Sequence, residues 1–413
     1  MPTRRAFIRN SAFAVVGTAA IPSFLTRAAF GAVEAGIRNK RLVVIFQRGA
    51  ADGLNIVVPH GERNYYAMRP TINIPRNAVI DLDGMFGLHP SMSAFQPLWQ
   101  QGHLAVVHAA GSPDPSRSHF DAQDFMESGT PGTKATEDGW LNRTLHDLPN
   151  PTDKAAFRAI AVGPSLPRIL SGSEPAVAIN NIGDFGVGGR GAGATANANT
   201  FESMYSESVD TVLHGTGRET FEAVRMLKSA DPSQYKPAFG ANYPRGRFGD
   251  SLRQLAQLIK ANLGVQVAFA DILGWDHHVN EGNTQGQLAN VLTDFSQSLA
   301  TFWTDLGDLG EDTIVITMSE FGRTARENGT HGTDHGHANA MFVLGGAVRG
   351  GKVYGRWPGL DQSQLYEGRD LAVTTDFRNV ISEALDHHLG NKSLSKVFPD
   401  FAISSQKYLQ LLG

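Results

Sequence analysis

TIVITMSEFGRTARENGTHGTDHGHANAMFVL, residues 313–344, joins two apolar runs through a polar loop. The first run, 313–318, is rich in β-branched residues and the second covers 340–344, so both are predicted to be buried strands. Residues just past the carboxyl end of a strand form the ligand crevice of an open α/β sheet. A hydrogen-bonded surface loop could carry the same letters, but the density of His and acidic residues favours a functional site. The candidate site residues in this loop are Glu320, Arg323, Asp334, His335 and His337.

Outward from this stretch, apolar runs alternate with segments of helical periodicity. The runs predicted to be strands are 42–46, 104–108, 159–162 and 265–270. The segments predicted to be helices are 90–101, 248–259, 288–306 and 380–385. Such alternation predicts an α/β fold with a mostly parallel central sheet and helices on both faces.

Polar clusters follow two of these strands. Asp52 comes a few residues after 42–46 in a Gly-flanked turn, where it either forms an Asx turn or acts as a metal-bridging carboxylate. Asp276 and His278 follow 265–270 with the spacing Asp-x-His, which is a moderate signal for metal binding. If the strands are neighbours in the sheet, these clusters converge with the loop after residue 318.

A third cluster, RSHFDAQD at 117–124, follows the strand at 104–108, and a helix is predicted to begin at Ser118. Ser118 and Asp121 approximate a capping box, which is the structural interpretation. The functional interpretation makes Ser118 a nucleophile or metal-facing hydroxyl at a helix N-terminus, where backbone amides could hold an oxyanion. The adjoining Arg117 and His119 favour function, with His119 as an acid/base or a metal ligand.

The composition of the 413-residue chain excludes several classes of function. With 41% hydrophobic residues it can bury a large core, as one α/β domain with insertions or as two domains. A net charge of -4 without basic runs gives no case for nucleic-acid binding. The absence of Cys excludes disulfides, thiolate metal sites, a Cys nucleophile and a formylglycine made from Cys, so metal ligands must be His, Asp or Glu.

The N-terminal residues predict export. An Arg pair in TRRAFIR, residues 3–9, precedes an apolar stretch, 12–21, that is too short to span a bilayer. An ordinary basic N-terminus is the alternative, but this order is typical of a twin-arginine signal, here assigned to 1–31. The sequence therefore predicts twin-arginine export to the periplasm or cell exterior, with no transmembrane span in the mature chain. The mature chain is predicted to be one domain, 40–413, with a Gly- and Ala-rich mobile insertion around 182–245.

Taken together, the clusters contain oxygen and imidazole ligands, one hydroxyl and two Arg side chains. This set suits transfer at a phosphate or sulfate ester assisted by one or two divalent ions, with Zn, Mn, Ca and Mg all open. A Ser-His-Asp hydrolase is less attractive because the chain has no G-x-S-x-G elbow.

Several motifs resemble one known family over nearly the whole mature chain. They are the twin-arginine start, RGAADGLN (48–55), SRSHFDAQD (116–124), GWDHHVN (274–280), SEFGRT (319–324), TDHGHANAMFVLGG (333–346) and KVYG (352–355). Together they resemble the family known as domain of unknown function 1501, itself similar to the alkaline phosphatase and sulfatase superfamily. The resemblance implies a metal site at the carboxyl edge of the sheet, an anionic ester as substrate, Asp52 as a metal-bridging residue and Ser118 near the nucleophile.

The same resemblance implies that Glu320 holds the strand-end position of an Asp-His pair and that His335 is a late ligand. Here the pair is Glu320-Phe321, so one imidazole is missing unless His119, His335 or His337 replaces it. The predicted metal ligands are Asp52, Asp276, His278, Glu320, Asp334 and His335. The predicted catalytic residues are Ser118, His119 and Arg323, and the predicted substrate-binding residues are Arg117 and His337. The alternative is a catalytically silent binding or cell-surface assembly protein on the same fold.

Overall fold

The computed structural model describes residues 40–149, 157–182 and 235–413, and Lys40–Gly413 forms one compact unit. The predicted export signal and most of the predicted insertion, 183–234, lie outside the described residues. Within the described part of the chain, no helix is long and apolar enough to cross a membrane.

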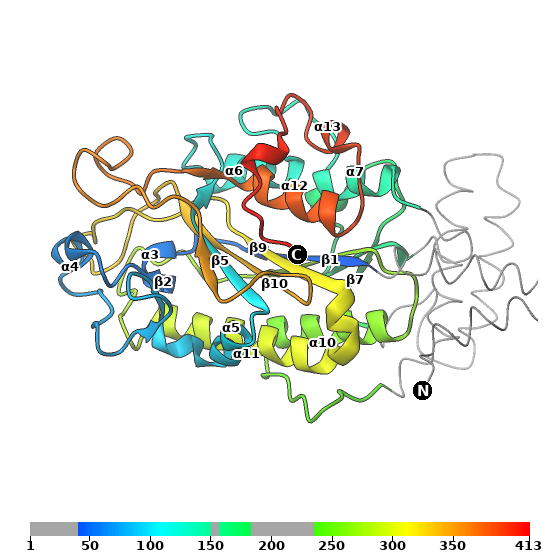
Figure 1. Cartoon of the computed structure of the whole chain (residues 1–413), viewed down its shortest axis with the longest axis horizontal. Coiled ribbons are helices and arrows are strands. Elements are labelled where there is room, and N and C mark those ends of the chain that lie inside the picture. Colours follow the sequence, from blue (N-terminus) through cyan, green and yellow to red (C-terminus); the bar gives the residue numbers. More distant parts are fainter. Residues whose placement is uncertain (1–39, 150–156, 183–234) are drawn as a thin grey trace, which may run out of the picture. The chain divides into compact units, whose positions relative to one another are not determined.

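A mostly parallel sheet forms the centre of this unit (Figure 1). Among the described residues it has nine strands. In spatial order they are β11 (Lys352–Tyr354), β5 (Leu104–Gly111), β10 (Asn339–Gly345), β9 (Thr313–Met318), β1 (Arg41–Gln47), β8 (Val267–Ile272), β6 (Ala159–Val162) and β7 (Val177–Ile179), while β12 (Thr375–Asp376) pairs with β5. Among the described strands of this sheet, β10 alone runs antiparallel to its neighbours.

The innermost strands are apolar throughout because both of their faces are covered. β1 pairs in parallel with β8 and β9, so that Val44 lies opposite Phe269 on one side and Ile316 on the other. Every residue of β1, β5, β9 and β10 is buried. The strands expected from the apolar runs are all present, with ends shifted by up to three residues.

Helices cover both faces of the sheet, which confirms the predicted fold class (Figure 1). One layer contains η1 (Pro90–Phe95), α5 (Gln96–Gln100), α10 (Arg247–Lys260) and α11 (Gln287–Leu306). The other contains α6 (His119–Ser128), α7 (Trp140–His146), α12 (Phe377–His387) and α13 (Leu394–Val397). The helix predicted over 90–101 is thus a 3₁₀ turn followed by a short α-helix, with Met92 non-helical inside the turn.

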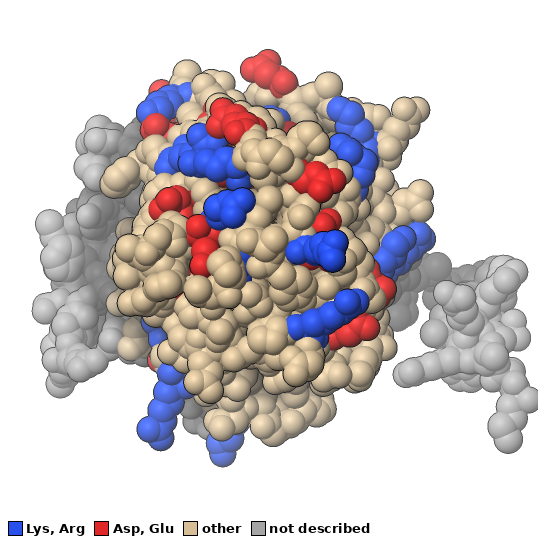
Figure 2. Space-filling view, turned by 90° about the vertical axis from the view of Figure 1, so that its left-hand side faces the viewer, with Lys and Arg blue, Asp and Glu red and all other residues tan. Residues whose placement is uncertain are grey.

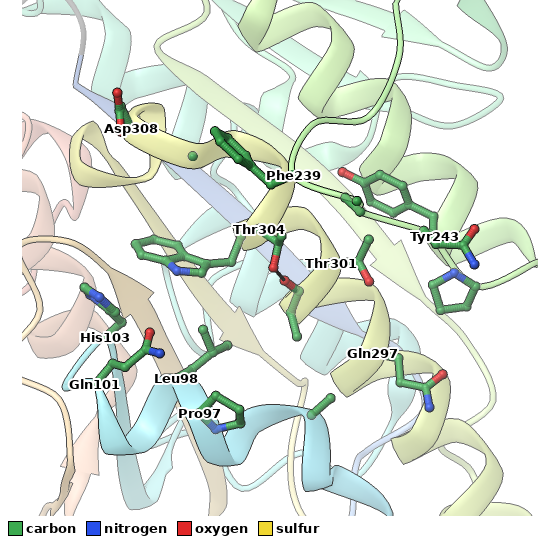
Figure 3. A pocket seen from close by; sticks show the side chains of 18 of the residues that line it. Pro97, Leu98, Gln101, His103, Phe239, Tyr243, Gln297, Thr301, Thr304 and Asp308 are labelled. Atoms are coloured by element: carbon green, nitrogen blue, oxygen red, sulfur yellow. Dashed lines mark hydrogen bonds between the residues drawn. The ribbon is translucent and has the colours of Figure 1, made fainter.

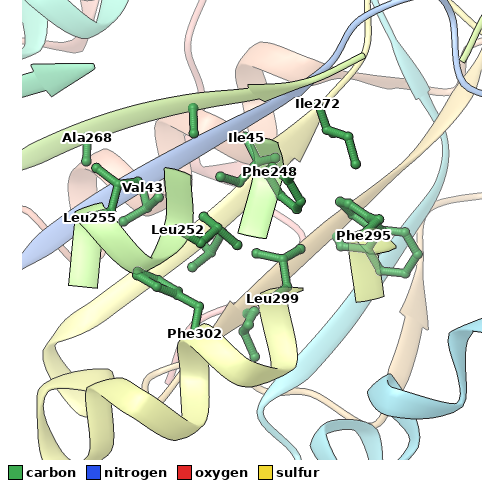
Figure 4. Close-up of a cluster of buried hydrophobic side chains, with 14 of the residues drawn as sticks. Val43, Ile45, Phe248, Leu252, Leu255, Ala268, Ile272, Phe295, Leu299 and Phe302 are labelled. Carbon is green, nitrogen blue, oxygen red and sulfur yellow. The ribbon is translucent and has the colours of Figure 1, made fainter. Parts of the chain in front are cut away.

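Alternate residues of β1 face the two helical layers. Val43 and Ile45 pack with Leu252 of α10 and Phe295 of α11, as Figure 4 shows, whereas Val44 belongs to the cluster on the opposite face. Full burial of one such side chain stabilises the fold by about 1.5–3 kcal/mol. Because successive side chains of β1 point to opposite faces of the sheet, this strand packs against both helical layers.

Short elements complete the unit. A small sheet is formed by β2 (Val57–Val58), β4 (Gly87–Leu88) and β3 (Ile80–Asp81). The remaining helical turns are α3 (Gly53–Ile56), α4 (Arg63–Met68), η3 (Arg168–Leu170), η6 (Gly307–Asp312) and η7 (Ser405–Lys407). Because β1, β5, β8 and β9 run in the same direction, their carboxyl ends meet at one edge, on the left in Figure 1 where α3 and α6 follow β1 and β5.

Candidate metal centre

Three strand ends bring together the side chains of His119, Asp276 and His335. His119 is the first residue of α6, which follows β5, while Asp276 follows β8 and His335 lies in the loop between β9 and β10. One ligand atom from each of these three residues lies within 4.8 Å of the other two. The predicted convergence of the strand-end clusters therefore occurs for these three residues.

His278 adds a fourth donor to this cluster. Its Nε2 lies 3.0 Å from His335 Nε2 and 3.1 Å from Asp276 Oδ1. His119 Nε2 lies 3.0 Å from His335 Nε2 and 3.6 Å from Asp276 Oδ2. Nitrogen atoms of three imidazoles thus surround one carboxylate.

The opposite ring nitrogen of each imidazole has an acceptor. Nδ1 of His119 lies 2.8 Å from Glu320 Oε1, Nδ1 of His335 lies 2.9 Å from the carbonyl oxygen of Arg117, and Nδ1 of His278 lies 3.1 Å from Asp334 Oδ1. If the rings are neutral, a proton on each Nδ1 satisfies these contacts and leaves a lone pair on each Nε2. Two bare Nε2 atoms 3.0 Å apart cannot hydrogen-bond to each other, whereas a cation between them satisfies both.

The spacing and chemistry of the donors fit a divalent metal ion. A tetrahedral Zn²⁺ site with metal–nitrogen bonds of about 2.0–2.1 Å has ligand atoms about 3.3 Å apart. The distances from His335 Nε2 to His119 Nε2 and Asp276 Oδ1 are 3.0 and 3.5 Å. Burial lowers the pKa of His335 and outweighs the raising effect of its hydrogen bond to the Arg117 carbonyl oxygen, and this favours the neutral ring that a metal ligand requires.

Glu320, a predicted ligand, lies behind His119. Its buried Oε1 accepts hydrogen bonds from His119 Nδ1, from Gln123 Nε2 at 2.8 Å and from the backbone N–H of Gly49 at 2.9 Å. Burial alone would raise the pKa of Glu320, but the hydrogen bonds from His119 and Gln123 outweigh it and hold the pKa below its usual value. Glu320 is therefore an ionised carboxylate that orients His119.

Arg323 holds Asp276 in place. The guanidinium is fully buried and donates to Asp276 Oδ1 and to the carbonyl oxygens of Gly49 and Ala50. Burial opposes ionisation of Asp276, but the hydrogen bond and charge of Arg323 outweigh it and lower the pKa of this carboxyl. Since its donors are already used by the chain, Arg323 acts in this arrangement by positioning Asp276.

Asp52 lies in a different group. Both of its carboxylate oxygens accept from the buried Arg69, one of them at 2.9 Å, and its side chain is 2% exposed. Glu281 hydrogen-bonds to Asp52 as well. Burial and the charge of Asp52 raise the pKa of Glu281 well above its ordinary value, so the shared proton lies on Glu281. This predicted metal-bridging residue thus has its oxygens occupied by protein donors.

The remaining predicted residues surround the cluster without joining it. Ser118 is exposed and its Oγ accepts from the backbone N–H of Asp121 at 3.5 Å, as an N-cap does. Arg117 donates through Nη2 to Glu367 and Asp370, at 2.6 and 2.7 Å. His337 is buried, and its Nε2 lies 3.1 Å from the carbonyl oxygen of Ser112.

Asp334 supports His278 from outside the cluster. Its Oδ1 also accepts from Asn328 Nδ2 at 3.2 Å. Burial favours the neutral acid, but hydrogen bonds from Asn328 and His278 lower the pKa of Asp334, which keeps it a good acceptor. Asp334 therefore resembles Glu320 in orienting an imidazole.

Two residues of the site were not found from sequence. Phe321 forms an apolar wall, with its ring centre 5.0 Å from that of His119 and 5.1 Å from that of His335. Gln123 donates to Glu320 from one helical turn after His119. The i, i+4 spacing of His119 and Gln123 was the available signal for a residue on the same face of α6.

The surface around this edge carries both signs of charge. Figure 2 shows Lys and Arg side chains interspersed with Asp and Glu on the face that lies at the left of Figure 1. A uniform field of one sign is therefore not expected across this face.

The fold and the cluster define a class: an α/β protein with a mostly parallel, doubly covered sheet and a candidate His/Asp metal centre at the carboxyl edge. The chain belongs to the family described as Protein of unknown function (DUF1501), which matches residues 39–397. The family resemblance read from its motifs is thereby confirmed. No curated protein matches the sequence.

Solved structures give weaker likenesses. The C-terminal periplasmic domain of EcEptC from Escherichia coli in complex with Zn is 10% identical, with 74% of this chain and 72% of that chain covered and a TM-score of 0.33. The PsFucS1 sulfatase from Pseudoalteromonas sp. is 12% identical, with 81% and 68% covered and a TM-score of 0.34. The phosphonate monoester hydrolase of Agrobacterium radiobacter is 11% identical, with 76% and 70% covered and a TM-score of 0.29. The roles of the site residues rest on this chain's own geometry.

Proposed function

We propose that this protein is an exported, metal-dependent hydrolase of phosphate or sulfate esters. The proposed metal ligands are His119, Asp276, His335 and His278. The observation that carries the proposal is the convergence of bare imidazole nitrogens on one carboxylate, with each Nδ1 held by an acceptor of the protein. A structural cluster of neutral His rings would gain nothing from facing lone pair to lone pair.

The protein's own residues prepare this site for an anionic ester. The chemistry that a divalent ion supplies in such a site is polarisation of an ester oxygen and neutralisation of charge on the transferred group. Glu320 and Asp334 orient His119 and His278, and Arg323 keeps Asp276 ionised. Phe321 shields one side of the cluster from water, which strengthens electrostatic contacts there.

Ser118 is the proposed nucleophile. It directly precedes the ligand His119, it is exposed, and it lies at the N-terminus of the ten-residue helix α6. Attack by Oγ on phosphorus or sulfur would form a seryl ester while the bond to the leaving alcohol oxygen breaks and the Oγ proton passes through water to that oxygen. Water would then hydrolyse the seryl ester and restore the Ser118 hydroxyl. Nearby backbone N–H groups and the helix dipole favour negative charge on the transferred group.

Elemental analysis and ester hydrolysis together test the proposal. The full chain, exported by its native route, is expected to contain bound divalent metal and to hydrolyse an aryl phosphate or an aryl sulfate. The variant His335→Ala should lose both metal and activity. His331→Ala is the matched control, because His331 lies in the same loop and contacts Thr71 instead of the cluster. Protein that binds none of Zn²⁺, Mn²⁺, Ca²⁺ or Mg²⁺ and cleaves neither ester would contradict the proposal and favour a silent binding protein.

The role of Ser118 needs a separate test. If Ser118 is the nucleophile, Ser118→Ala abolishes turnover while the bound metal is retained. If water is the nucleophile, this variant keeps most of its activity, and metal dependence alone remains of the proposal. Metal content and activity therefore distinguish the two parts of the mechanism.

A further inference from the structure

A second concave site lies apart from the metal cluster. It is a cavity of about 1010 Å³ between α5, the exposed face of α11 and the segment 239–245 (Figure 3). Gln297, Thr301 and Thr304 of α11 recur along one face and form its floor. None of the metal-cluster residues lines it, so the two sites are separate.

A buried carboxylate holds one wall of this cavity in place. Asp305 of α11 is fully buried and accepts from Tyr243 Oη at 2.8 Å and from the backbone N–H of Ala238 at 2.7 Å. Tyr235 and Lys260 donate to the same carboxylate. The segment 239–245, which forms this wall, is therefore held against α11 in the absence of ligand. This reduces the entropic cost of binding.

Aromatic rings border the cavity. Phe239 is 75% exposed, and its backbone adopts a left-handed conformation with φ +52. Its ring lies over Gly307, where an added Cβ would come within 2.4 Å of the ring. Trp303 is half-buried and packs against His103 with ring centres 4.9 Å apart. A strained backbone that presents an exposed ring costs free energy without ligand, and such features cluster at binding sites.

Unused hydrogen-bonding groups lie beside these rings. The side chains of Gln101, Asn242, Gln297 and Thr301 line the cavity and make no hydrogen bond to any other described residue. They offer both donors and acceptors. Arg245, Asp308 and Glu311 add charges of both signs at the rim, so the site has no strong preference for an ion.

We propose that this cavity binds a neutral oligosaccharide. The C–H face of a sugar ring packs on an aromatic side chain. Each sugar hydroxyl both donates and accepts hydrogen bonds, so a sugar can pair with the amide, hydroxyl and carboxylate groups that line this cavity. An acyl chain would bury these polar groups without partners, at a cost for each. A proline-rich peptide also favours aromatic grooves, but its exposed carbonyls only accept and would leave the acceptors of the cavity unpaired.

Binding of defined sugars to the full chain tests this inference. The probes are the neutral hexasaccharides of β-1,4-glucose, α-1,4-glucose and β-1,4-N-acetylglucosamine, followed by calorimetry and by saturation-transfer NMR. At least one is expected to bind at millimolar concentration or below. Phe239→Ala and Gln101→Ala should each weaken it about fivefold to tenfold, the effect of one ring contact or one hydrogen bond.

Matched substitutions control for indirect effects. Gln100→Ala alters the neighbouring exposed Gln of α5 outside the cavity, and Phe120→Ala removes an exposed ring beside the metal cluster. Both should bind the sugar as the parent protein does. The inference is overturned if none of the three sugars binds, if Phe239→Ala and Gln101→Ala bind unchanged, or if only a proline-rich peptide occupies the cavity. Sugar binding that is lost in Phe120→Ala would move the site to the metal cluster and equally overturn it.

Discussion

Two groups of charged side chains at the same sheet edge differ in whether their carboxylate oxygens are already occupied by protein donors. In the metal cluster the side chain of Asp276 is 46% exposed, whereas that of Asp52 in the buried group is 2% exposed. Nε2 of His119 and Nε2 of His335 lie 3.6 and 3.5 Å from the carboxylate oxygens of Asp276. Around Asp52, by contrast, Arg69 occupies both carboxylate oxygens.

An acidic residue at a strand end can act as a ligand only if its protein partners leave one of its lone pairs free toward the site. Arg323 uses one oxygen of Asp276 and leaves the other near His119. Arg69 leaves neither oxygen of Asp52 available, and Glu281 contributes its proton as well. The first group leaves an exposed carboxylate beside imidazole nitrogens, whereas the second is closed by its own ion pair and hydrogen bonds.

The largest expected effect comes from removing Arg69. Arg69→Met leaves Asp52 buried without its cation and frees the carbonyl oxygens of Ala325 and Thr324 that Arg69 now contacts. The free energy of unfolding in urea should fall by about 3–5 kcal/mol. Arg76→Met, at an exposed position, should change it by no more than about 0.5 kcal/mol. If Arg69→Met and the parent protein have equal free energies of unfolding, Arg69 does not form the buried pair with Asp52 in solution.

A smaller effect is expected when Glu320 loses its charge. Glu320→Gln weakens the hold on His119 Nδ1, so the affinity for Zn²⁺ measured by chelator competition should fall about 10- to 100-fold. The exposed Glu311→Gln serves as the control and should bind Zn²⁺ like the parent. Unchanged affinity in Glu320→Gln would show that His119 is not a ligand through Nε2.

The buried group should also produce a pH dependence of stability. Because the folded-state pKa of Glu281 is raised by burial and by Asp52, the folded protein binds the Glu281 proton more tightly than the unfolded chain does. The contribution of this proton to the free energy of unfolding is complete below the ordinary Glu pKa of 4.5. It declines as the pH rises toward the pKa of Glu281 in the folded protein. Glu281→Gln keeps the neutral side chain at every pH, so its urea unfolding, measured with chelator present, should lose this decline. An identical slope in parent and variant would place the proton elsewhere.

The smallest effect concerns the helix cap at Ser118. Ser118→Ala should lower the free energy of unfolding by about 1 kcal/mol through loss of the contact with the Asp121 amide. Ser118→Asp restores a good cap and should recover the stability, but it cannot restore a nucleophilic hydroxyl. Recovery of ester hydrolysis in Ser118→Asp would leave Ser118 with a capping role only.

Much of the architecture was accessible from local patterns. Apolar runs such as 42–46 predict buried strands because a parallel strand with both faces covered needs no alternation. The helices α10 and α11 follow from their helical periodicity. The grouping of His335 with Asp276 followed from the direction of the strands.

Local sequence patterns predicted the α/β class and the strand ends that carry polar residues, and they grouped Asp276 with His335, whose side chains lie together in the structure. Only the tertiary structure decided that Asp52 pairs with Arg69 and that His119 rests on Glu320, 201 positions away. The physical reason is that the role of a carboxylate or an imidazole depends on which of its lone pairs and protons are already used. Those partners come from distant strands and loops, so neither the residue type nor its spacing specifies them.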